Sequence, residues 1–340
     1  MERCLDLAQK GFGKTAPNPM VGAVVVHKGR IIGEGYHEFF GGPHAEVNAI
    51  NSVSDPSLLS ESVLYISLEP CIHHGKTPPC ADLILEKKIP RVVVGCKDPN
   101  IINTGKGIDK LKNAGVEVVL SALESRCQEL NRRFFTFHLK KRPYIILKWA
   151  QSSDGFIDRK RSLAESGNQE RLTGQESNIR VHRWRSQEQA IMVGTTTALL
   201  DNPELNVRYV DGKNPLRVVL DREKKIPGNY KLFSSDQKTL VFTNGENESH
   251  PNVEFVNIYF SGGVFSQGFS FLFTLNIQSI IVEGGRELIN SFIKVNLWDE
   301  ARVITVPQKL GSGIKAPSLD LKGVPADKSG VDHIQILRNS

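Results

Sequence analysis

The sequence has no apolar run that approaches about 18 residues, so we expect no membrane-spanning helix. Its first residues lack the apolar stretch of a secretory signal peptide. Five cysteines, an odd number in a chain of 340 residues, argue against a disulfide framework and favour a reducing compartment. There is no internal repeat and no low-complexity tract. We therefore expect a cytoplasmic globular protein without a membrane partner.

A strong excess of one charge is also absent. Lys and Arg number 43 and Asp and Glu 37, which gives a net charge of +6 and a pI near 9.0. The basic residues are spread along the chain, and no RNA-binding motif accompanies them. They are explained either by an ordinary solvated surface or by attraction of a phosphorylated small molecule, and we expect no nucleic-acid partner.

The length predicts two domains. In residues 1–143, short apolar strands alternate with helical segments, which predicts a sheet covered by helices. A charged helical stretch over 124–142 ends at Pro143, where we place the domain boundary. The expected strands are 21–27, 30–36, 63–68, 91–95 and 116–120, and the expected helices are 44–52, 81–88 and 108–114.

Residues 144–340 predict a second α/β domain. A Gly-x-Gly-x-x-Gly fingerprint is missing, so we do not expect a Rossmann dinucleotide fold. The expected strands are 144–149, 190–193, 216–220, 239–243, 279–282 and 301–306, with helices around 176–185 and 286–295.

The most informative residues are His44, Glu46, Cys71 and Cys80. One imidazole and two thiolates form a three-ligand zinc site whose fourth position stays open, as catalytic zinc sites require. Cys71 is expected at the end of a strand and Cys80 at the start of a helix. Glu46 follows His44 by two residues and is placed to move protons, as in zinc deaminases that act on nucleobases. The pattern therefore predicts hydrolytic deamination.

A structural zinc site remains an alternative, because His73 or His74 could supply a fourth ligand. Cys4, Cys96 and Cys127 have no partner spacing, and we expect them to be buried as small apolar residues.

Several motifs surround this constellation and continue through the second half. Together they resemble the bifunctional deaminase/reductase family of riboflavin biosynthesis, and the long loop between the two cysteines fits that family. The motifs are Ala16-Pro17-Asn18-Pro19-Met20-Val21-Gly22, Gly35-Tyr36-His37, His74-Gly75-Lys76-Thr77-Pro78-Pro79-Cys80, Lys97-Asp98-Pro99-Asn100, Lys148-Trp149-Ala150-Gln151-Ser152-Ser153-Asp154-Gly155, Val193-Gly194-Thr195-Thr196-Thr197, Asp201-Asn202-Pro203 and Val282-Glu283-Gly284-Gly285.

The resemblance implies an N-terminal cytidine-deaminase-like three-layer domain and a C-terminal dihydrofolate-reductase-like α/β domain. It implies zinc-dependent deamination of 2,5-diamino-6-ribosylamino-4(3H)-pyrimidinone 5′-phosphate, followed by reduction of the ribosyl group to ribityl with NADPH. A homo-oligomer is expected. The deaminase pocket would be lined by Asn18, His37, Lys76, Asp98 and Asn100.

For the second domain, the resemblance implies catalytic roles for Lys148 and Glu283. Substrate binding would use Glu283 again, with Gln169, Arg185, Leu205 and Arg208. Cofactor binding would use Ala150, Arg171, Thr197, Asp201, Gly284 and Gly285.

The chain departs from the family pattern just before the helix expected around 176–185. The family usually has Ser-x-Trp-Ile-Thr there, whereas this sequence has Gln169-Glu170-Arg171-Leu172-Thr173. A degenerate reductase half is thus one alternative. A base deaminase acting on tRNA with an accessory domain is a second, and a non-catalytic zinc-stabilised binding protein is a third, although Glu46 argues against it.

Overall fold

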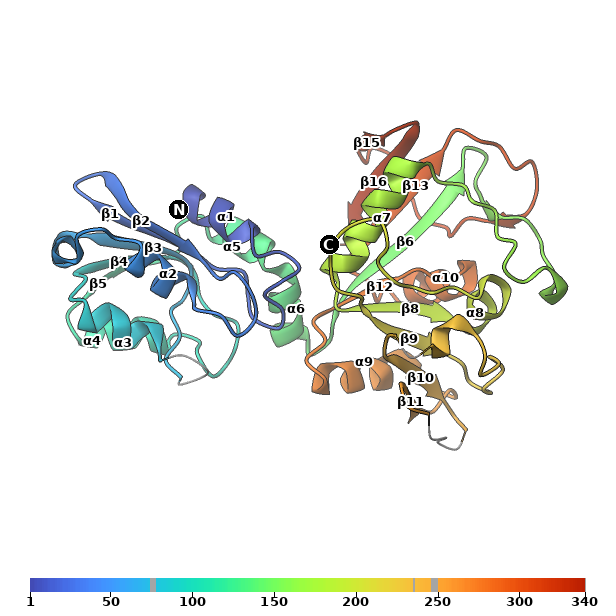
Figure 1. The fold of residues 1–340 in the computed structure, drawn as a ribbon, viewed down its shortest axis with the longest axis horizontal. Helices are drawn as coiled ribbons and strands as arrows, with labels where there is room; N and C mark the ends of the chain where they lie inside the picture. Colours follow the sequence, from blue (N-terminus) through green and yellow to red (C-terminus); the bar gives the residue numbers. More distant parts are fainter. Residues whose placement is uncertain (74–77, 235, 246–249, 340) are drawn as a thin grey trace. The chain divides into compact units, whose positions relative to one another are not determined.

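The computed structural model describes residues 1–73, 78–234, 236–245 and 250–339. The chain divides into two compact units, Met1–Lys141 and Arg142–Ser340 (Figure 1). Each unit is a layered α/β structure, and each is described by itself below.

The first unit is built on a five-stranded sheet in the order β2-β1-β3-β4-β5. β1 is antiparallel to both of its neighbours, and β3, β4 and β5 are parallel to one another. Short runs of Val, Ile and Leu fill the central strands, as expected for strands that are buried on both faces. The strands are β1 (Gly22–His27), β2 (Arg30–Tyr36), β3 (Val63–Leu68), β4 (Arg91–Cys96) and β5 (Glu117–Val119).

Helices cover both faces of this sheet (Figure 1). On one face, α2 (Ala45–Asn51), α3 (Cys80–Glu86) and α4 (Lys106–Asn113) pack on the sheet through residues such as Ala49, Ile84 and Leu111. On the other face lie α1 (Glu2–Gln9), α5 (Glu124–Leu130) and α6 (Arg132–Lys140). The predicted three-layer fold is confirmed.

Two local predictions for this unit need correction. Cys71 does not end a strand, because β3 stops at Leu68. The helical stretch 124–142 is two helices that are interrupted at Asn131. The buried Asn131 amide leaves the helical pattern to bond both the N–H and the C=O of Met20, each at 2.8 Å, and so fixes the segment that leads into β1.

The second unit is built on a nine-stranded sheet in the order β11-β10-β9-β8-β12-β6-β13-β16-β15. The strands from β11 to β13 are parallel, and β16 and β15 add an antiparallel edge. They are β6 (Tyr144–Ser152), β8 (Ala190–Gly194), β9 (Leu216–Leu220), β10 (Thr239–Thr243), β11 (Val253–Asn257), β12 (Ser279–Val282), β13 (Glu300–Val306), β15 (Ala326–Ser329) and β16 (Asp332–Arg338). A separate two-stranded ribbon pairs β7 (Phe156–Asp158) with β14 (Ile314–Lys315).

Alternate residues of β6 point into two different cores, one on each face of the sheet. Ile146 packs with α7 (Gln175–Gln187) and α8 (Thr195–Asp201), whereas Ile145 and Leu147 pack with α9 (Val264–Thr274) and α10 (Arg286–Lys294). Short 3-10 helices lie at Pro56–Glu61, Leu163–Glu165 and Lys231–Phe233.

The six strands expected in this half are all present, and the predicted α/β class is confirmed. Among the described residues, no helix is both long enough and apolar enough to cross a bilayer. All five cysteines are free and buried, as expected for Cys4, Cys96 and Cys127.

Candidate active sites

In the first unit, the predicted site residues gather at one edge of the sheet. The start of β1 lies beside the ends of β2, β3 and β4, because Gly22 pairs with Tyr36 and Leu68 pairs with Cys96. The loops that leave this edge carry Asn18, His37, Cys71 and Asp98. α2 and α3 begin near the same edge and bring the remaining candidates, His44, Glu46 and Cys80.

His44, Cys71 and Cys80 form a cluster in which the three donor atoms lie within 4.8 Å of one another. The Nδ1 atom of His44 is 3.5 Å from Sγ of Cys71 and 3.3 Å from Sγ of Cys80. The thiol of Cys80 and the His44 imidazole both hydrogen-bond the Cys71 sulfur and lower its pKa. Cys80 is the first residue of α3, as predicted.

These distances fit zinc. A tetrahedral ion bonded at about 2.3 Å to sulfur and about 2.0 Å to nitrogen separates the two donor types by about 3.5 Å. His73 does not join the cluster in the described part of the chain, since its Nδ1 is 3.0 Å from Oδ1 of Asn103. His74 lies outside the described residues. The donor set is therefore suited to an ion with an open coordination position.

Glu46 is the second residue of α2, in the first turn of the helix, and is only 4% exposed. Burial, together with the nearby Cys71, raises the pKa of its carboxyl to about 7. It is not a member of the metal cluster. A carboxyl that is buried, unligated and adjacent to a metal site can accept and release a proton near neutral pH.

Asn18 and His37 form a hydrogen-bonded pair beside this cluster. Nδ1 of His37 is 2.9 Å from the carbonyl oxygen of Pro43, and its Nε2 is 3.1 Å from Nδ2 of Asn18. Since a carbonyl only accepts, Nδ1 carries the proton and Nε2 accepts from Asn18. Burial lowers the pKa of His37, which favours this neutral form. The pair fixes the loop that presents His44.

Asp98 and Asn100 lie on the loop after β4. Asp98 is buried, burial raises its pKa, and its two carboxylate oxygens accept from the Asn100 N–H and the Asn103 amide at 2.8 and 2.7 Å. Lys76, which we also expected in this pocket, lies outside the described residues.

Glu69 is a residue of this site that the sequence analysis missed. Its buried carboxylate accepts hydrogen bonds from four backbone N–H groups, those of Asp98, Gly105, Gly107 and Ile108, at 3.0–3.3 Å. It therefore connects the segment that ends in Cys71 to the loop that carries Asp98. The only sequence signal was an acidic residue directly before Pro70-Cys71.

The second unit contains a cavity of about 790 Å³ at the carboxyl ends of β6, β8 and β12. Ligands in open parallel sheets bind at this end of the strands. Every residue that the resemblance implied for this half lines the cavity: Lys148, Ala150, Gln169, Arg171, Arg185, Thr197, Asp201, Leu205, Arg208, Glu283, Gly284 and Gly285. The two departures, Gln169 and Arg171, are among them.

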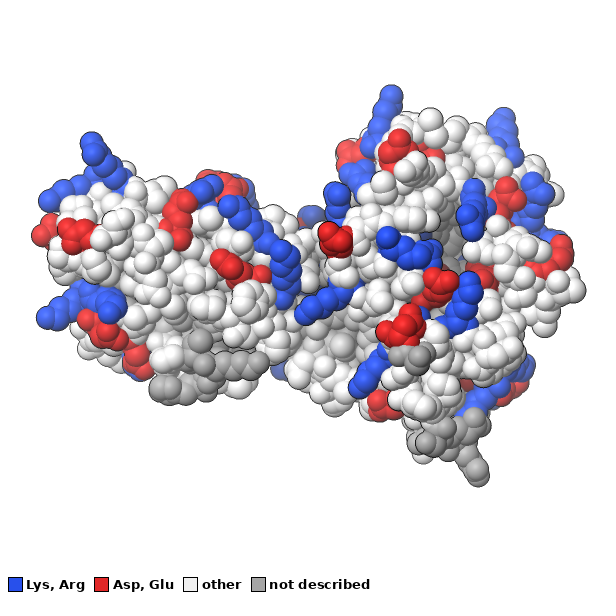
Figure 2. Space-filling model, viewed as in Figure 1, with Lys and Arg blue, Asp and Glu red and all other residues white. Residues whose placement is uncertain are grey.

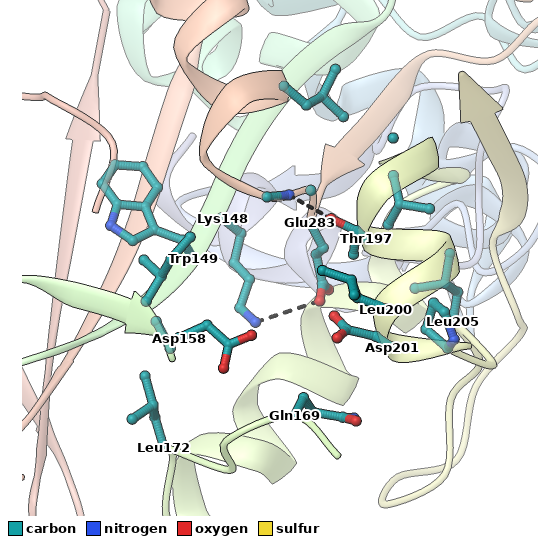
Figure 3. Close-up of a pocket in the computed structure, with 18 of the residues that line it drawn as sticks. Lys148, Trp149, Asp158, Gln169, Leu172, Thr197, Leu200, Asp201, Leu205 and Glu283 are labelled. Atoms are coloured by element: carbon teal, nitrogen blue, oxygen red, sulfur yellow. Dashed lines mark hydrogen bonds and ion pairs between the residues drawn. The ribbon is translucent and has the colours of Figure 1, made fainter. Parts of the chain in front are cut away.

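Glu283 is the centre of a buried charge cluster in this cavity (Figure 3). Arg185 binds it through two parallel hydrogen bonds of 2.9 and 2.8 Å, and Nζ of Lys148 is 3.4 Å from its Oε2. Burial alone would raise the pKa of Glu283, but the two cations outweigh it and hold that pKa well below its ordinary range. Burial lowers the pKa of Lys148, although Glu283 opposes this.

The beginnings of α8 and α10 close another side of the cavity. The hydroxyl of Thr197 accepts a 2.8 Å hydrogen bond from the N–H of Gly285, which directly precedes α10 (Figure 3). Glycine at this position allows a ligand to approach the helix N-terminus closely. Asp201 is ion-paired with the buried Arg161, a cavity residue that the sequence analysis did not select.

On the visible surface, Lys and Arg are dispersed among Asp and Glu rather than gathered in one patch (Figure 2).

Comparison with known proteins identifies both halves. Residues 1–96 match the cytidine and deoxycytidylate deaminase zinc-binding region, and residues 143–335 match the RibD C-terminal domain. The riboflavin biosynthesis protein RibD of Aquifex aeolicus is 39% identical over 95% of this chain and 90% of its own length. The RibD of Bacillus amyloliquefaciens is 37% identical over 94% and 86%.

Two solved structures match this chain over nearly its full length. The diaminohydroxyphosphoribosylaminopyrimidine deaminase/5-amino-6-(5-phosphoribosylamino)uracil reductase of Thermotoga maritima has a TM-score of 0.87 at 37% identity and covers 100% of this chain and 97% of its own. Acinetobacter baumannii RibD also has a TM-score of 0.87, at 30% identity, with 99% and 97% covered.

The fold and the two sites thus define a two-domain enzyme in which a zinc-dependent deaminase is joined to an NADP-dependent reductase. The chain belongs to the RibD family of bifunctional riboflavin biosynthesis enzymes. The predicted family, fold class, function and cofactors are confirmed, and this outcome favours the bifunctional enzyme over a tRNA deaminase or a non-catalytic zinc protein.

Proposed function

We propose that the chain carries out both reactions of the family, with each unit performing one: residues 1–143 the deamination and residues 144–340 the reduction. The observation that carries this proposal is the presence of two separate sites, each with the groups its reaction needs. The first has three zinc donors and an unligated acid, and the second has a cavity with a paired lysine and glutamate.

In the deaminase, we propose that His44, Cys71 and Cys80 hold the zinc. Zinc held by these ligands acidifies water and so supplies a nucleophile at neutral pH. Glu46 takes the proton of the attacking water and delivers it to the ring nitrogen and then to the departing ammonia. The raised pKa of Glu46 supports this role, because the group must both accept and release a proton.

The groups around Glu46 suit a polar heterocycle. The amides of Asn18 and Asn100 and the imidazole of His37 can donate to or accept from the edge of the pyrimidine, and Asp98 can accept from its amino groups. Lys76 is proposed as a partner of the substrate's phosphate. The substrate is the 2,5-diamino-6-ribosylamino-4(3H)-pyrimidinone 5′-phosphate named above.

In the reductase, NADPH supplies the hydride. We propose that Lys148 donates a proton to the ring oxygen of the ribosyl group as the sugar opens to an imine. Glu283, which Arg185 keeps ionised, stabilises the positive charge that develops at the anomeric carbon. Arg208, Gln169 and Leu205 contact the substrate.

The cofactor would lie against Ala150, Arg171, Thr197, Asp201 and the Gly284-Gly285 turn. Arg171 replaces the usual tryptophan with a cation, which suits the phosphates of NADPH. We therefore favour an active reductase over a degenerate one, and NADPH over NADH.

We further propose a cytoplasmic homo-oligomer that has no nucleic-acid partner. The charge pattern supports the last point, since Figure 2 contains no extended basic patch on the visible face.

A product assay on the purified chain tests this function. With the diaminopyrimidine ribotide alone, we expect release of ammonia and accumulation of the deaminated ribotide. With NADPH added, we expect loss of absorbance at 340 nm and formation of the ribityl product. Ammonia release without any NADPH oxidation would instead identify a degenerate reductase.

A further inference from the structure

His182 is an imidazole in the reductase cavity that none of the proposed roles uses. It lies on the cavity side of α7, one turn before Arg185, and is only 4% exposed. Its Nδ1 accepts a 3.0 Å hydrogen bond from the backbone N–H of Arg208. The ring of Tyr209 packs edge-on against it, with the ring centroids 4.6 Å apart.

The contact with Arg208 fixes the tautomer of His182. A backbone N–H can only donate, so Nδ1 must be unprotonated, and the proton of the neutral ring is on Nε2. Burial, with help from Arg185 and Arg208, lowers the pKa of His182 to about 4, so the ring stays neutral at physiological pH. Within the part of the chain that the structure describes, Nε2 has no hydrogen-bond partner.

The surroundings indicate what this donor can bind. Arg185 is largely occupied, because it donates twice to Glu283 and once to the carbonyl oxygen of Asn206. The Arg208 guanidinium donates to Glu204 and to Asn206. His182 therefore offers a donor that has no competing partner, in the part of the cavity where these two arginines favour negative charge.

We propose that His182 is a substrate-binding residue of the reductase, which donates from Nε2 to an acceptor oxygen on the ribosyl phosphate part of the substrate. This inference rests on the proposed reductase function. The His182 ring also accepts a hydrogen bond from the backbone N–H of Arg208, so the same ring would bind the substrate and position Arg208.

Three variants of the full chain separate these two contributions. In His182→Gln, the side-chain amide can take the place of the Nε2 donor, and in His182→Asn, the amide oxygen can take the place of the Nδ1 acceptor. His182→Ala removes both. Arg183→Ala is the matched control, because Arg183 is exposed on the same helix and does not line the cavity.

Steady-state reduction of the deaminated ribotide is measured with saturating NADPH, and the dissociation constant for NADPH is measured separately by fluorescence. Loss of a hydrogen bond to a charged acceptor corresponds to about a 10- to 100-fold effect. We expect His182→Ala and His182→Asn to raise KM for the ribotide by this factor. The dissociation constant for NADPH and the deaminase rate should not change. His182→Gln should recover KM to within about threefold of the unmodified chain.

Two results would overturn the proposal. If His182→Asn matches the unmodified chain while His182→Gln is impaired, His182 only positions Arg208. If all three variants keep the original KM, His182 has no part in binding. An unmodified chain that does not oxidise NADPH would refute the proposed reductase function itself, which is a separate outcome.

Discussion

Removal of the Glu69 carboxylate should lower the stability and the activity of the deaminase without changing its zinc ligands or Glu46. Glu69 is 4% exposed and accepts from four backbone N–H groups. If all four amides stayed buried without a partner in Glu69→Ala, the cost would be about 4–12 kcal/mol. Such a cost approaches the whole stability of a typical domain, so we expect the loop to open toward water. The free energy of unfolding should then fall by about 2–4 kcal/mol.

The same change should lower the kcat/KM of deamination by about 10- to 100-fold, because Asp98 and Asn100 lie on the loop that moves. Zinc should stay at one ion per chain, since the three ligands are untouched. The reductase rate serves as an internal control and should not change. Glu69→Gln should have an intermediate effect, because one amide oxygen remains to accept.

Glu61→Ala is the matched surface control for Glu69. The Glu61 side chain is 63% exposed, and its ion-pair partners among the described residues are His27 and Lys28. Exposed pairs of this kind contribute little stability. The assays are thermal unfolding, zinc content and ammonia release. If Glu69→Ala keeps both its melting temperature and its kcat/KM, the loop does not depend on this carboxylate and the argument is wrong.

Three further predictions concern residues that we propose for catalysis and for cofactor binding. Glu46→Gln should keep zinc but slow ammonia release by roughly 10²–10⁴-fold, and near-normal turnover would remove Glu46 from its role as proton carrier. Glu283→Gln should abolish NADPH oxidation and destabilise the chain by about 3–5 kcal/mol at pH 7, because Arg185 loses its buried partner. Folding lowers the pKa of Glu283, so the stability that its ionised carboxylate contributes is present above the unfolded pKa of about 4.3 and is lost as pH falls below it. If the difference in unfolding free energy between the unmodified chain and Glu283→Gln disappeared between pH 8 and 6, that sign would be contradicted. Arg171→Ala should weaken NADPH binding roughly tenfold if its guanidinium contacts a cofactor phosphate, and an unchanged dissociation constant would show that it does not.

Buried strands were the most predictable part of the fold. The runs 63–68, 216–220, 239–243 and 279–282 became strands with those same limits, because continuous β-branched and apolar residues suit a parallel sheet with both faces covered.

The missed elements have weaker local signals. α9 (Val264–Thr274) is rich in phenylalanine and contains Gly268, both of which disfavour a helix in isolation. Gly268 lies against the ring of Phe242, where an added Cβ would be 3.1 Å from the ring, so packing between distant segments determines both the glycine and the helix.

The metal cluster could be predicted because cysteine and histidine at this spacing have few other uses. The roles of Glu69 and His182 could not be predicted in this way. Each side chain binds the backbone of a residue at least 26 positions away, and no local sequence pattern encodes such a partner. The residues of the reductase cavity were predicted through the resemblance. They come from β6, α7, α8, the loops before α7 and after α8, and the turn before α10, which only the folded sheet brings together.

A complementation assay tests most directly the claim that one chain holds two independent active sites. Glu46→Gln and Glu283→Gln are each given the diaminopyrimidine ribotide with NADPH, first separately and then mixed, while ammonia and absorbance at 340 nm are followed. We predict that Glu46→Gln gives neither signal, that Glu283→Gln gives ammonia alone, and that the mixture gives both ammonia and NADPH oxidation. A mixture of folded, zinc-loaded variants that fails to oxidise NADPH would contradict the account.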